Sequence, residues 1–239
     1  PIFPGMKLGI RDLGNQSWDL SAFLPENFDT IRLMEPLKTR YGRRFPDANI
    51  AMVSSPVQIE YLAIDSGSVY LTGLVDDFME KKLPVLLRFQ DRLLYKNPHL
   101  AIDEHYSDTS STTFLSPYYS HPATDSIRAD ISYIRTGRVD ASGILITPTG
   151  KFDTEREVIF IEKIVKGYKY SVFGWTPAPE YSLNKHYTIY RWYTKELNLP
   201  IAEAVLNEED YIEYIRYQYD SPMRLSFTGE NVSCKDGSD

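Results

Sequence analysis

The chain is poor in the residues that build disulfides and metal centres. Its single cysteine, Cys234, lies in a polar C-terminal stretch, and it has only four histidines. One thiol excludes an intrachain disulfide and a zinc site built from several cysteines. No apolar run approaches the roughly 18 residues typical of a membrane-spanning helix. We therefore expect a fold held by its own hydrophobic core, with no cofactor, no metal and no membrane span.

Positive charge is also scarce, because the formal net charge is −7 and the isoelectric point is near 5.2. Proteins that wrap nucleic-acid phosphates need clustered lysine and arginine. The exception is residues 38–44, where Lys38, Arg40, Arg43 and Arg44 lie close together. A run this short is typical of a solvated loop or helix end, so we expect no direct nucleic-acid binding.

Motifs that carry catalysis are missing. Gly9 and Gly14 have the spacing of a phosphate-binding loop. That motif requires a lysine and then a serine or threonine after the second glycine, but Asn15 and Gln16 stand there. There is no nucleophile elbow and no dinucleotide-binding glycine pattern. The sequence therefore predicts no catalytic and no cofactor-binding residues, and it favours a non-enzymatic protein while leaving an enzyme with a dispersed site as a third hypothesis.

Two groups of polar residues were considered as metal ligands. His99, Asp103, Glu104 and His105 lie close in sequence but lack the spacing of a helical ligand pair. A metal-dependent nuclease needs carboxylates and a lysine that converge, and Asp153, Glu157, Glu162 and Lys163 lie near the predicted hairpin. Glu162 and Lys163 are neighbours in a strand, however, so their side chains should point to opposite faces. Neither group predicts a metal site.

Tyrosine is the residue in excess, with 18 copies against 11 phenylalanines and 3 tryptophans. Tyrosine joins a large apolar body to a polar tip, which suits protein interfaces. It is also a good strand former, and a β-rich fold alone would use many tyrosines.

Alternating apolar residues predict an antiparallel sheet with several hairpins. The main prediction is a hairpin over residues 157–175 that turns at Lys166-Gly167, since glycine supplies the positive φ of tight turns. Residues 57–72 predict a second hairpin with its turn at 65–68. Further strands are expected at 127–133, at 143–147 before a turn at 148–150, and at 186–193.

Helix signals are fewer and shorter. Capping residues and prolines predict short helices near 26–34, 73–82, 200–206 and 207–219, whereas 84–95 fits a strand or a helix. The predicted fold class is therefore α+β: an antiparallel sheet, a few short helices, an irregular N-terminal arm and a polar C-terminal tail.

The chain divides into three predicted parts. Residues 1–56 are rich in proline and glycine and form an extended arm packed on the body or on a neighbour; 57–229 form one domain; 230–239 form the tail. Within the domain, 97–126 reads as a long polar surface loop. Long loops in compact domains usually carry function, so this loop is the predicted contact or binding loop.

Two strand-turn-strand segments resemble known sensors. Residues Asp65 to Tyr70 and Ile146 to Phe152 are similar to turns in PAS and Cache domains. The resemblance implies an extracytoplasmic domain that closes over a small molecule, and we keep it as the alternative function.

The leading hypothesis is a structural or interaction subunit of a larger assembly, most concretely a structural protein of a tailed-phage virion. Its partners would be protein subunits of the same assembly, and the chain would be oligomeric. The predicted interface residues are Trp18, Phe23 and Phe28 in the arm and Tyr118 and Tyr119 in the loop. The sequence leaves the localisation unknown outside that hypothesis.

Overall fold

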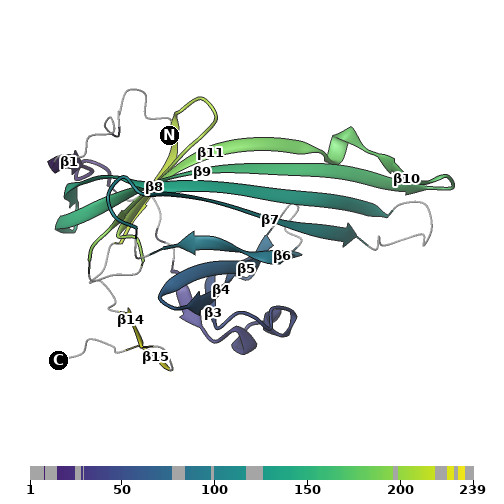
Figure 1. Cartoon of the computed structure of the whole chain (residues 1–239), viewed down its shortest axis with the longest axis horizontal. Coiled ribbons are helices and arrows are strands. Elements are labelled where there is room, and N and C mark those ends of the chain that lie inside the picture. Colours follow the sequence, from purple (N-terminus) through teal and green to yellow (C-terminus); the bar gives the residue numbers. More distant parts are fainter. Residues whose placement is uncertain are drawn as a thin grey trace.

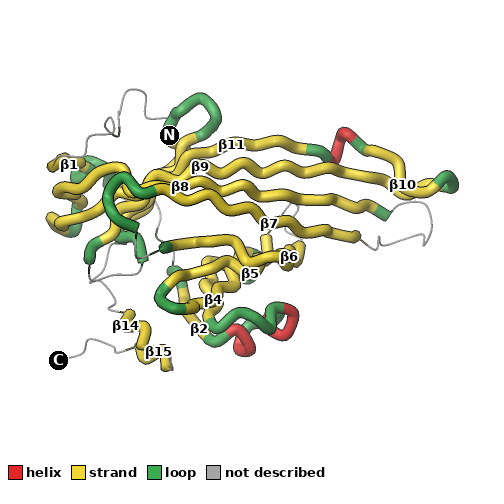
Figure 2. The backbone as a smooth tube through the Cα atoms, in the orientation of Figure 1, coloured by secondary structure: helices red, strands yellow, loops and turns green. Residues whose placement is uncertain are grey.

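The computed structural model describes residues 8, 15–24, 28, 30–76, 84–97, 100–116, 126–195 and 199–218, and the backbone of 225–228 and 231–234. This part of the chain is built almost entirely of strands (Figure 2). The strands are β1 (Asn15–Asp19), β2 (Arg32–Met34), β3 (Ile50–Ser55), β4 (Gln58–Asp65), β5 (Ser68–Asp76), β6 (Val85–Lys96), β7 (His105–Ser116), β8 (Ile127–Thr147), β9 (Gly150–Ser171), β10 (Gly174–Pro177), β11 (Leu183–Tyr193), β12 (Ala202–Leu206), β13 (Ile212–Tyr217), β14 (Leu225–Thr228) and β15 (Asn231–Cys234).

The large sheet is organised around one very long hairpin. Strands β8 and β9 have 21 and 22 residues and pair antiparallel from the turn at 148–149 almost to their far ends. At roughly 3.3 Å per residue each spans about 70 Å. The sheet order is β1-β8-β9-β11-β12-β13, with β7 paired to β8 and β10 paired to β9.

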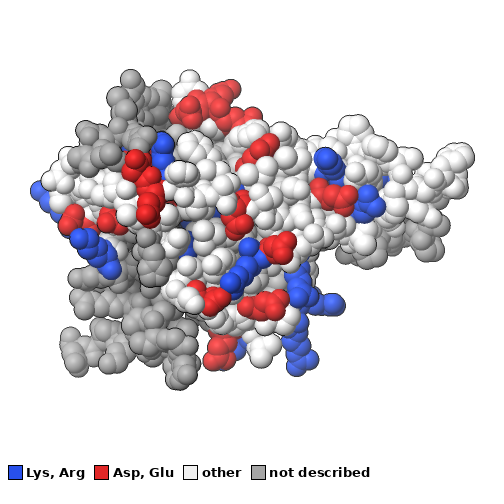
Figure 3. All heavy atoms as spheres, viewed as in Figure 1, with Lys and Arg blue, Asp and Glu red and all other residues white. Residues whose placement is uncertain are grey.

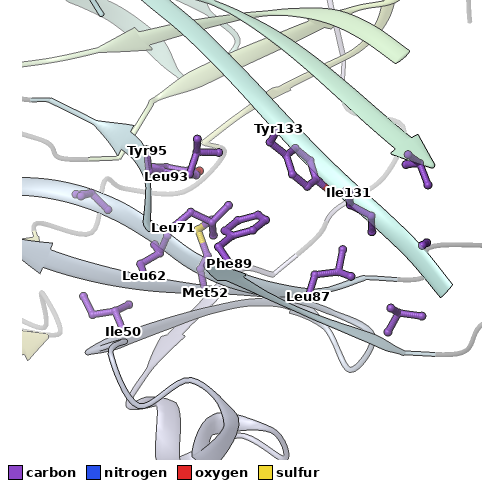
Figure 4. Close-up of a cluster of buried hydrophobic side chains, with 14 residues drawn as sticks. Ile50, Met52, Leu62, Leu71, Leu87, Phe89, Leu93, Tyr95, Ile131 and Tyr133 are labelled. Carbon is purple, nitrogen blue, oxygen red and sulfur yellow. The ribbon is translucent and has the colours of Figure 1, made fainter. Parts of the chain in front are cut away.

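The small sheet is the antiparallel meander β2-β3-β4-β5-β6. It lies against one face of the large sheet near the middle of the long hairpin (Figure 1). The interface is a cluster in which Leu62, Leu87 and Phe89 of the small sheet meet Ile131 and Tyr133 of β8 (Figure 4). Because such apolar burial is the main favourable term in folding, this cluster joins the two sheets into one sandwich.

Two further clusters complete the body. Phe45 stacks on Tyr61 at 3.9 Å between ring centroids, on the side of the small sheet that faces away from the sandwich. The short 3-10 helices η1 (Pro36–Lys38) and η2 (Gly42–Arg44) precede Phe45 and carry the basic run of residues 38–44. On the opposite face of the large sheet, Trp18, Leu145 and Trp192 belong to another buried cluster.

The distal part of the large sheet extends past the sandwich. In Figure 1 the ends of β7, β8, β9 and β11, with β10, reach beyond the small sheet as a projecting arm. We call this projecting end, which is distinct from the N-terminal arm predicted over residues 1–56, the arm, and the rest of the molecule the body. The body therefore anchors a sheet whose far end has no second layer from the small sheet.

The predicted antiparallel sheet is confirmed, but the α+β class is not, because the described residues are almost all strand. The described residues contain only three short 3-10 helices, the third being η3 (Pro179–Tyr181). The helices predicted at 200–206 and 207–219 are β12 and β13, and the run at 84–95 is β6. The helix predicted from 73 is strand β5 as far as Asp76, with 77–83 outside the described residues. Sheet pairing overrides local helix propensity at these sites.

The hairpin predicted at Lys166-Gly167 is also wrong. Strand β9 continues through both residues, which pair with Asp130 and Ala129 of β8. Gly167 is required for a different reason, because a Cβ there would lie 2.5 Å from the Cβ of Tyr181 in η3. The turn falls instead at Val172-Phe173, between β9 and β10. The hairpins predicted at 57–72 and around 148–150 are confirmed.

The first 56 residues contribute strands to both sheets. Strand β1 runs parallel to β8, and β2 and β3 form the first part of the small sheet. The short helix predicted at 26–34 is replaced at its end by β2, while residues 25–27 and 29 lie outside the description. The predicted 97–126 loop contains strand β7, and residues 117–125 lie outside the description.

Candidate functional site

A row of alternating charges crosses the face of the large sheet that packs against the small sheet, which we call its inner face. Glu157 of β9 is in register with Arg191 of β11, Arg191 with Glu203 of β12, and Glu203 with Arg216 of β13. Arg191 Nε donates to Glu203 Oε2 at 2.7 Å, and Arg216 Nη2 lies 2.6 Å from Glu203 Oε1. Opposite charges directly across strands stabilise a sheet. We call these four residues the charge ladder.

The ladder continues toward the small sheet through tyrosine and arginine. Tyr106 donates its hydroxyl hydrogen to Glu157 Oε1 at 2.9 Å, and Arg135 Nε donates to Tyr106 Oη at 3.1 Å. Arg135 Nη2 also donates to the carbonyl of Tyr95 in β6 at 2.6 Å. These bonds connect β6, β7, β8 and β9, so the polar network ties the two sheets together beside their apolar interface.

The electrostatics of this network follow from burial. Burial opposes ionisation of Glu203, but the guanidinium groups of Arg191 and Arg216 outweigh it and hold the pKa of Glu203 below its usual value. Burial lowers the pKa of Lys96 to about 8, although the carboxylate of Glu157 acts in the other direction. Burial raises the pKa of Glu60, whose Oε2 atom has no hydrogen-bond partner among the described residues. These charged groups are therefore buried between the two sheets, where they interact with one another.

A second buried ion pair lies on the other face. Arg156 Nε and Nη2 each donate to a carboxylate oxygen of Asp140 at 2.8 Å, and Arg156 Nη1 donates to the carbonyl of Leu8. Asp140 lies at the bulge where the register of β8 against β9 shifts between Val139 and Ala141. An extra residue in one strand redirects its side chain, which brings Asp140 onto the arginine. The guanidinium of Arg156 and the carboxylate of Asp140 are thus both engaged in contacts that hold the fold together.

One groove is formed by the large sheet and the β12–β13 connection. It has a volume of about 250 Å³ and includes Phe160, Glu162, His186 and Asp210 in its lining. His186 Nε2 lies 3.9 Å from Glu162 Oε1, and its backbone N–H donates to Glu208 Oε1 at 3.2 Å. Most of the lining comes from the face away from the small sheet. The sensor hypothesis predicts a pocket between the long loop and the sheet, and this groove does not lie there.

The apex of the arm, which is the turn between β9 and β10, has exposed apolar side chains, whereas the interior of the body has buried charged ones. Val172 and Phe173, the two residues of the β9–β10 turn, are 82% and 91% exposed. Turn tips are usually polar or glycine. Figure 3 shows that the end of the projection carries neither red nor blue atoms on the face in view. The apex is therefore an exposed apolar feature at the farthest reach of the arm.

The turn itself does not require apolar residues. Ser171 Oγ accepts a hydrogen bond from the N–H of Phe173 at 3.2 Å and donates to the carbonyl of Gly174 at 3.2 Å. Gly174 takes the left-handed conformation with φ of 91°, which glycine adopts without steric cost. The turn is thus closed by Ser171 and Gly174, and the side chains of Val172 and Phe173 make no necessary contribution to it.

Aromatic and basic side chains lie immediately behind the apex. Trp175 of β10 is paired across from Tyr170 of β9, and their rings meet edge to face at 5.3 Å. The guanidinium of Arg128 lies 4.3 Å from the ring centroid of Tyr168 and 5.5 Å from that of Trp175. The exposed residues Lys166 and Lys169 belong to the same part of β9. We call residues 166–177 with Arg128 the arm tip.

The predicted interface residues occupy different environments. Trp18 is buried, donates to the carbonyl of Leu8 at 3.2 Å and meets Trp192 edge to face at 5.9 Å, so its ring is part of this chain's own core. Phe23 packs against the same cluster. Phe28 is 67% exposed. Tyr118 and Tyr119 lie outside the described residues. Of the three that are described, Trp18 and Phe23 meet in one buried cluster and Phe28 lies exposed.

The residues weighed as metal ligands, among them Asp103, Glu104 and His105, are described except for His99. No group of three or more His, Cys, Asp or Glu gathers as metal ligands within the described part of the chain, and His99 lies outside it. Lys163 is 4.0 Å from Asp76 of the small sheet, whereas Glu162 lies beside His186 on the other face. This placement confirms that Glu162 and Lys163 point to opposite faces.

Sequence reasoning missed the arm tip and the charge ladder. The arm tip was missed because the hairpin turn was predicted at Lys166-Gly167. A serine and a glycine that flank two residues, as Ser171 and Gly174 do, are themselves a turn signal. The ladder depends on which strands are neighbours, and no local pattern reports that. Only a register of β9 with β11 and of β11 with β12 aligns its members.

Comparison with protein-family models, curated proteins and solved structures gives no match for this chain. Within the described residues, no helix has the length and apolar character to span a membrane. The functional argument therefore rests on the geometry above.

Proposed function

We propose that this chain is a non-enzymatic structural or interaction subunit of a larger assembly. In this proposal the body docks on neighbouring subunits and the arm reaches outward to make contact. The observation that carries it is the arm itself, a sheet that extends beyond the sandwich (Figure 1). This sheet ends in an apex whose apolar side chains are exposed. An exposed apolar feature that folding does not need indicates a binding surface.

The distribution of ionisable groups supports a scaffold role for the body. Arg191 and Glu203 are bonded to each other, and Arg156 is bonded to Asp140. General acid–base or nucleophilic catalysis needs a group that faces a substrate with a proton or electron pair to offer. These buried groups instead face one another across strands.

The body also offers exposed apolar side chains for subunit contacts. Leu24 and Phe28 are largely exposed, Ile31 is 42% exposed, and the three lie within eight positions of one another. Aromatic and aliphatic anchors of this kind dominate the energy of protein interfaces. Phe28 therefore remains a proposed interface residue, whereas the buried Trp18 is assigned to the core.

The native mass of the protein isolated from its source tests this proposal. A discrete multimer or a particle visible by electron microscopy is expected, and a tailed-phage virion is the most concrete form of that particle. Phe28→Asp should weaken the multimer, while Leu37→Asp, at a site 74% exposed in η1, serves as the matched control. A monomer at native concentration would contradict the proposal.

A further inference from the structure

We propose that the arm tip inserts into the surface of an anionic lipid bilayer. This inference rests on the proposed function, because it names what the outward-reaching arm contacts. It follows from the order of side chains along the tip: apolar residues at the apex, aromatic rings behind them and cations farther back. Peripheral membrane contacts use this order, since each group then lies at the depth it prefers.

The apex supplies the part that enters the bilayer. Val172 and Phe173 occupy the turn that ends β9, and both side chains are almost fully exposed. Both side chains lie at the end of the hairpin, so an apolar partner that buries both must enclose the whole turn. A bilayer does this without a preformed cavity.

Aromatic rings follow at the depth of the lipid headgroups. Tyr170 and Trp175 lie two positions from Val172 and Phe173 along their strands, which is about 7 Å at the rise of an extended strand. Tryptophan and tyrosine concentrate at the interface between hydrocarbon and water, because one end of each ring system is polar. Interfacial segments bury their apolar face by roughly 5–10 Å, which matches this spacing.

Cations lie behind the rings and exceed the nearby acidic groups. The described end of the arm has Arg128, Lys166 and Lys169 against Asp130 and Glu180, and Asp130 Oδ2 is 3.2 Å from Arg128 Nη2. This excess stands out in a chain whose net charge is −7. Local cations near a membrane surface are attracted to anionic lipids even when the protein is acidic overall. The charge therefore favours an anionic bilayer.

The affinity of one tip should be modest. Burying one large apolar side chain changes a binding constant by roughly tenfold or more, and the apex has only two. Several copies held in one assembly would bind far more tightly, because the second and later contacts become intramolecular. A weak tip on a multimer is thus consistent with both proposals.

The chain contains its own reporter for the test. Of its three tryptophans, Trp18 and Trp192 are buried, while Trp175 is 37% exposed and lies in the tip. The full chain is titrated with vesicles of phosphatidylcholine mixed with phosphatidylglycerol, and with vesicles of phosphatidylcholine alone. We expect a blue shift of tryptophan emission with the mixed vesicles and quenching by brominated lipids, with a smaller response to phosphatidylcholine.

Variants assign the binding to the tip. Val172→Asp with Phe173→Asp should lower partitioning into mixed vesicles about tenfold or more, and Leu37→Asp should leave it unchanged. Lys166→Glu with Lys169→Glu should remove the preference for anionic vesicles. Trp175→Phe should abolish the spectral shift while co-sedimentation with vesicles persists.

No blue shift and no co-sedimentation at saturating lipid would overturn the inference, as would binding that survives the apex variant. Either result leaves the native mass to decide the proposed function separately. A discrete multimer that ignores vesicles would indicate that the arm contacts a protein. A monomer that binds vesicles through its tip would sustain the inference and contradict assembly.

Discussion

The interior of the body and the tip of the arm use side chains in opposite ways. In the body, Glu157, Arg191 and Glu203 lie buried between sheets, where charge is usually avoided. At the tip, Val172 and Phe173 lie exposed, where apolar groups are usually avoided. The buried charges are compensated by neighbours in register, and the exposed apolar groups have no such compensation within the turn.

This difference separates what folding requires from what it does not. A buried arginine is tolerated only where an opposite charge and hydrogen bonds meet it, so the ladder depends on accurate strand register. The apex places no comparable demand on the fold. Stability should therefore be sensitive to the ladder and insensitive to the apex, whereas contact with a partner should show the reverse.

The largest expected effect comes from breaking the ladder. Arg191→Leu removes one partner of Glu203 and leaves that buried carboxylate with Arg216 alone. Breaking a buried pair in this way costs about 3 kcal/mol or more of unfolding free energy. Urea denaturation followed by circular dichroism measures the loss.

The matched control is Arg216→Leu. The side chain of Arg216 is 50% exposed, so its loss should cost about 1 kcal/mol or less. Equal losses at the two positions would show that the buried part of the ladder has no special weight, and the contrast between body and tip would then fail.

The next effect concerns Lys96, whose Nζ lies 3.7 Å from the ring centroid of Tyr193 beside the ladder. Its folded pKa of about 8 is below the ordinary value of 10.5. Between these pH values the unfolded chain binds more protons than the folded one, so stability rises with pH in that window. The gain from pH 8 to 10 should be on the order of 1 kcal/mol, reduced from the full shift because Lys96 is partly exposed.

Lys96→Met isolates this contribution. Its unfolding free energy should rise less between pH 8 and 10 than the parent's, since burial also lowers the pKa of Lys163 and that contribution remains. The parent-minus-variant difference should be flat at lower pH. The comparison is best stopped near pH 10, because burial raises the pKa of Tyr95 and Tyr193, and tyrosine ionisation in the unfolded chain then lowers stability. A parent without the rise would contradict the assigned pKa.

A smaller effect is expected at the turn that presents the apex. Gly174→Ala forces alanine into φ of 91°, although a Cβ would have open space around it. The cost should be about 1 kcal/mol from backbone strain alone. Gly174→Asn should cost less, because asparagine tolerates left-handed conformations better. Thermal unfolding of the two variants gives the order; equal melting temperatures would mean that the turn is not strained.

Local patterns predicted the strands better than their connections. Alternation identified residues 127–133 and 186–193 as strands, and the turn at 148–149 followed from proline and glycine. The helix predicted at 200–206 failed because proline before an apolar run also suits the edge of a buried strand. β12 pairs with neighbours on both sides, which no local signal reports.

The site was harder to predict than the fold. Gly167 looked like a turn residue, but it is glycine because η3 packs closely on β9. That misreading placed the apex residues inside a strand. Trp18 looked like a docking anchor, yet its partners Trp192 and Leu8 are distant in sequence and visible only in the folded chain.

We propose that the apex serves contact and not folding, and the unfolding free energy of the double variant Val172→Asp/Phe173→Asp distinguishes these two roles. Two exposed apolar side chains become charged at a turn closed by Ser171 and Gly174. We expect an unfolding free energy within about 0.5 kcal/mol of the parent's, as for surface substitutions generally. A loss of about 2 kcal/mol or more would contradict it, because the apex would then belong to the folded core.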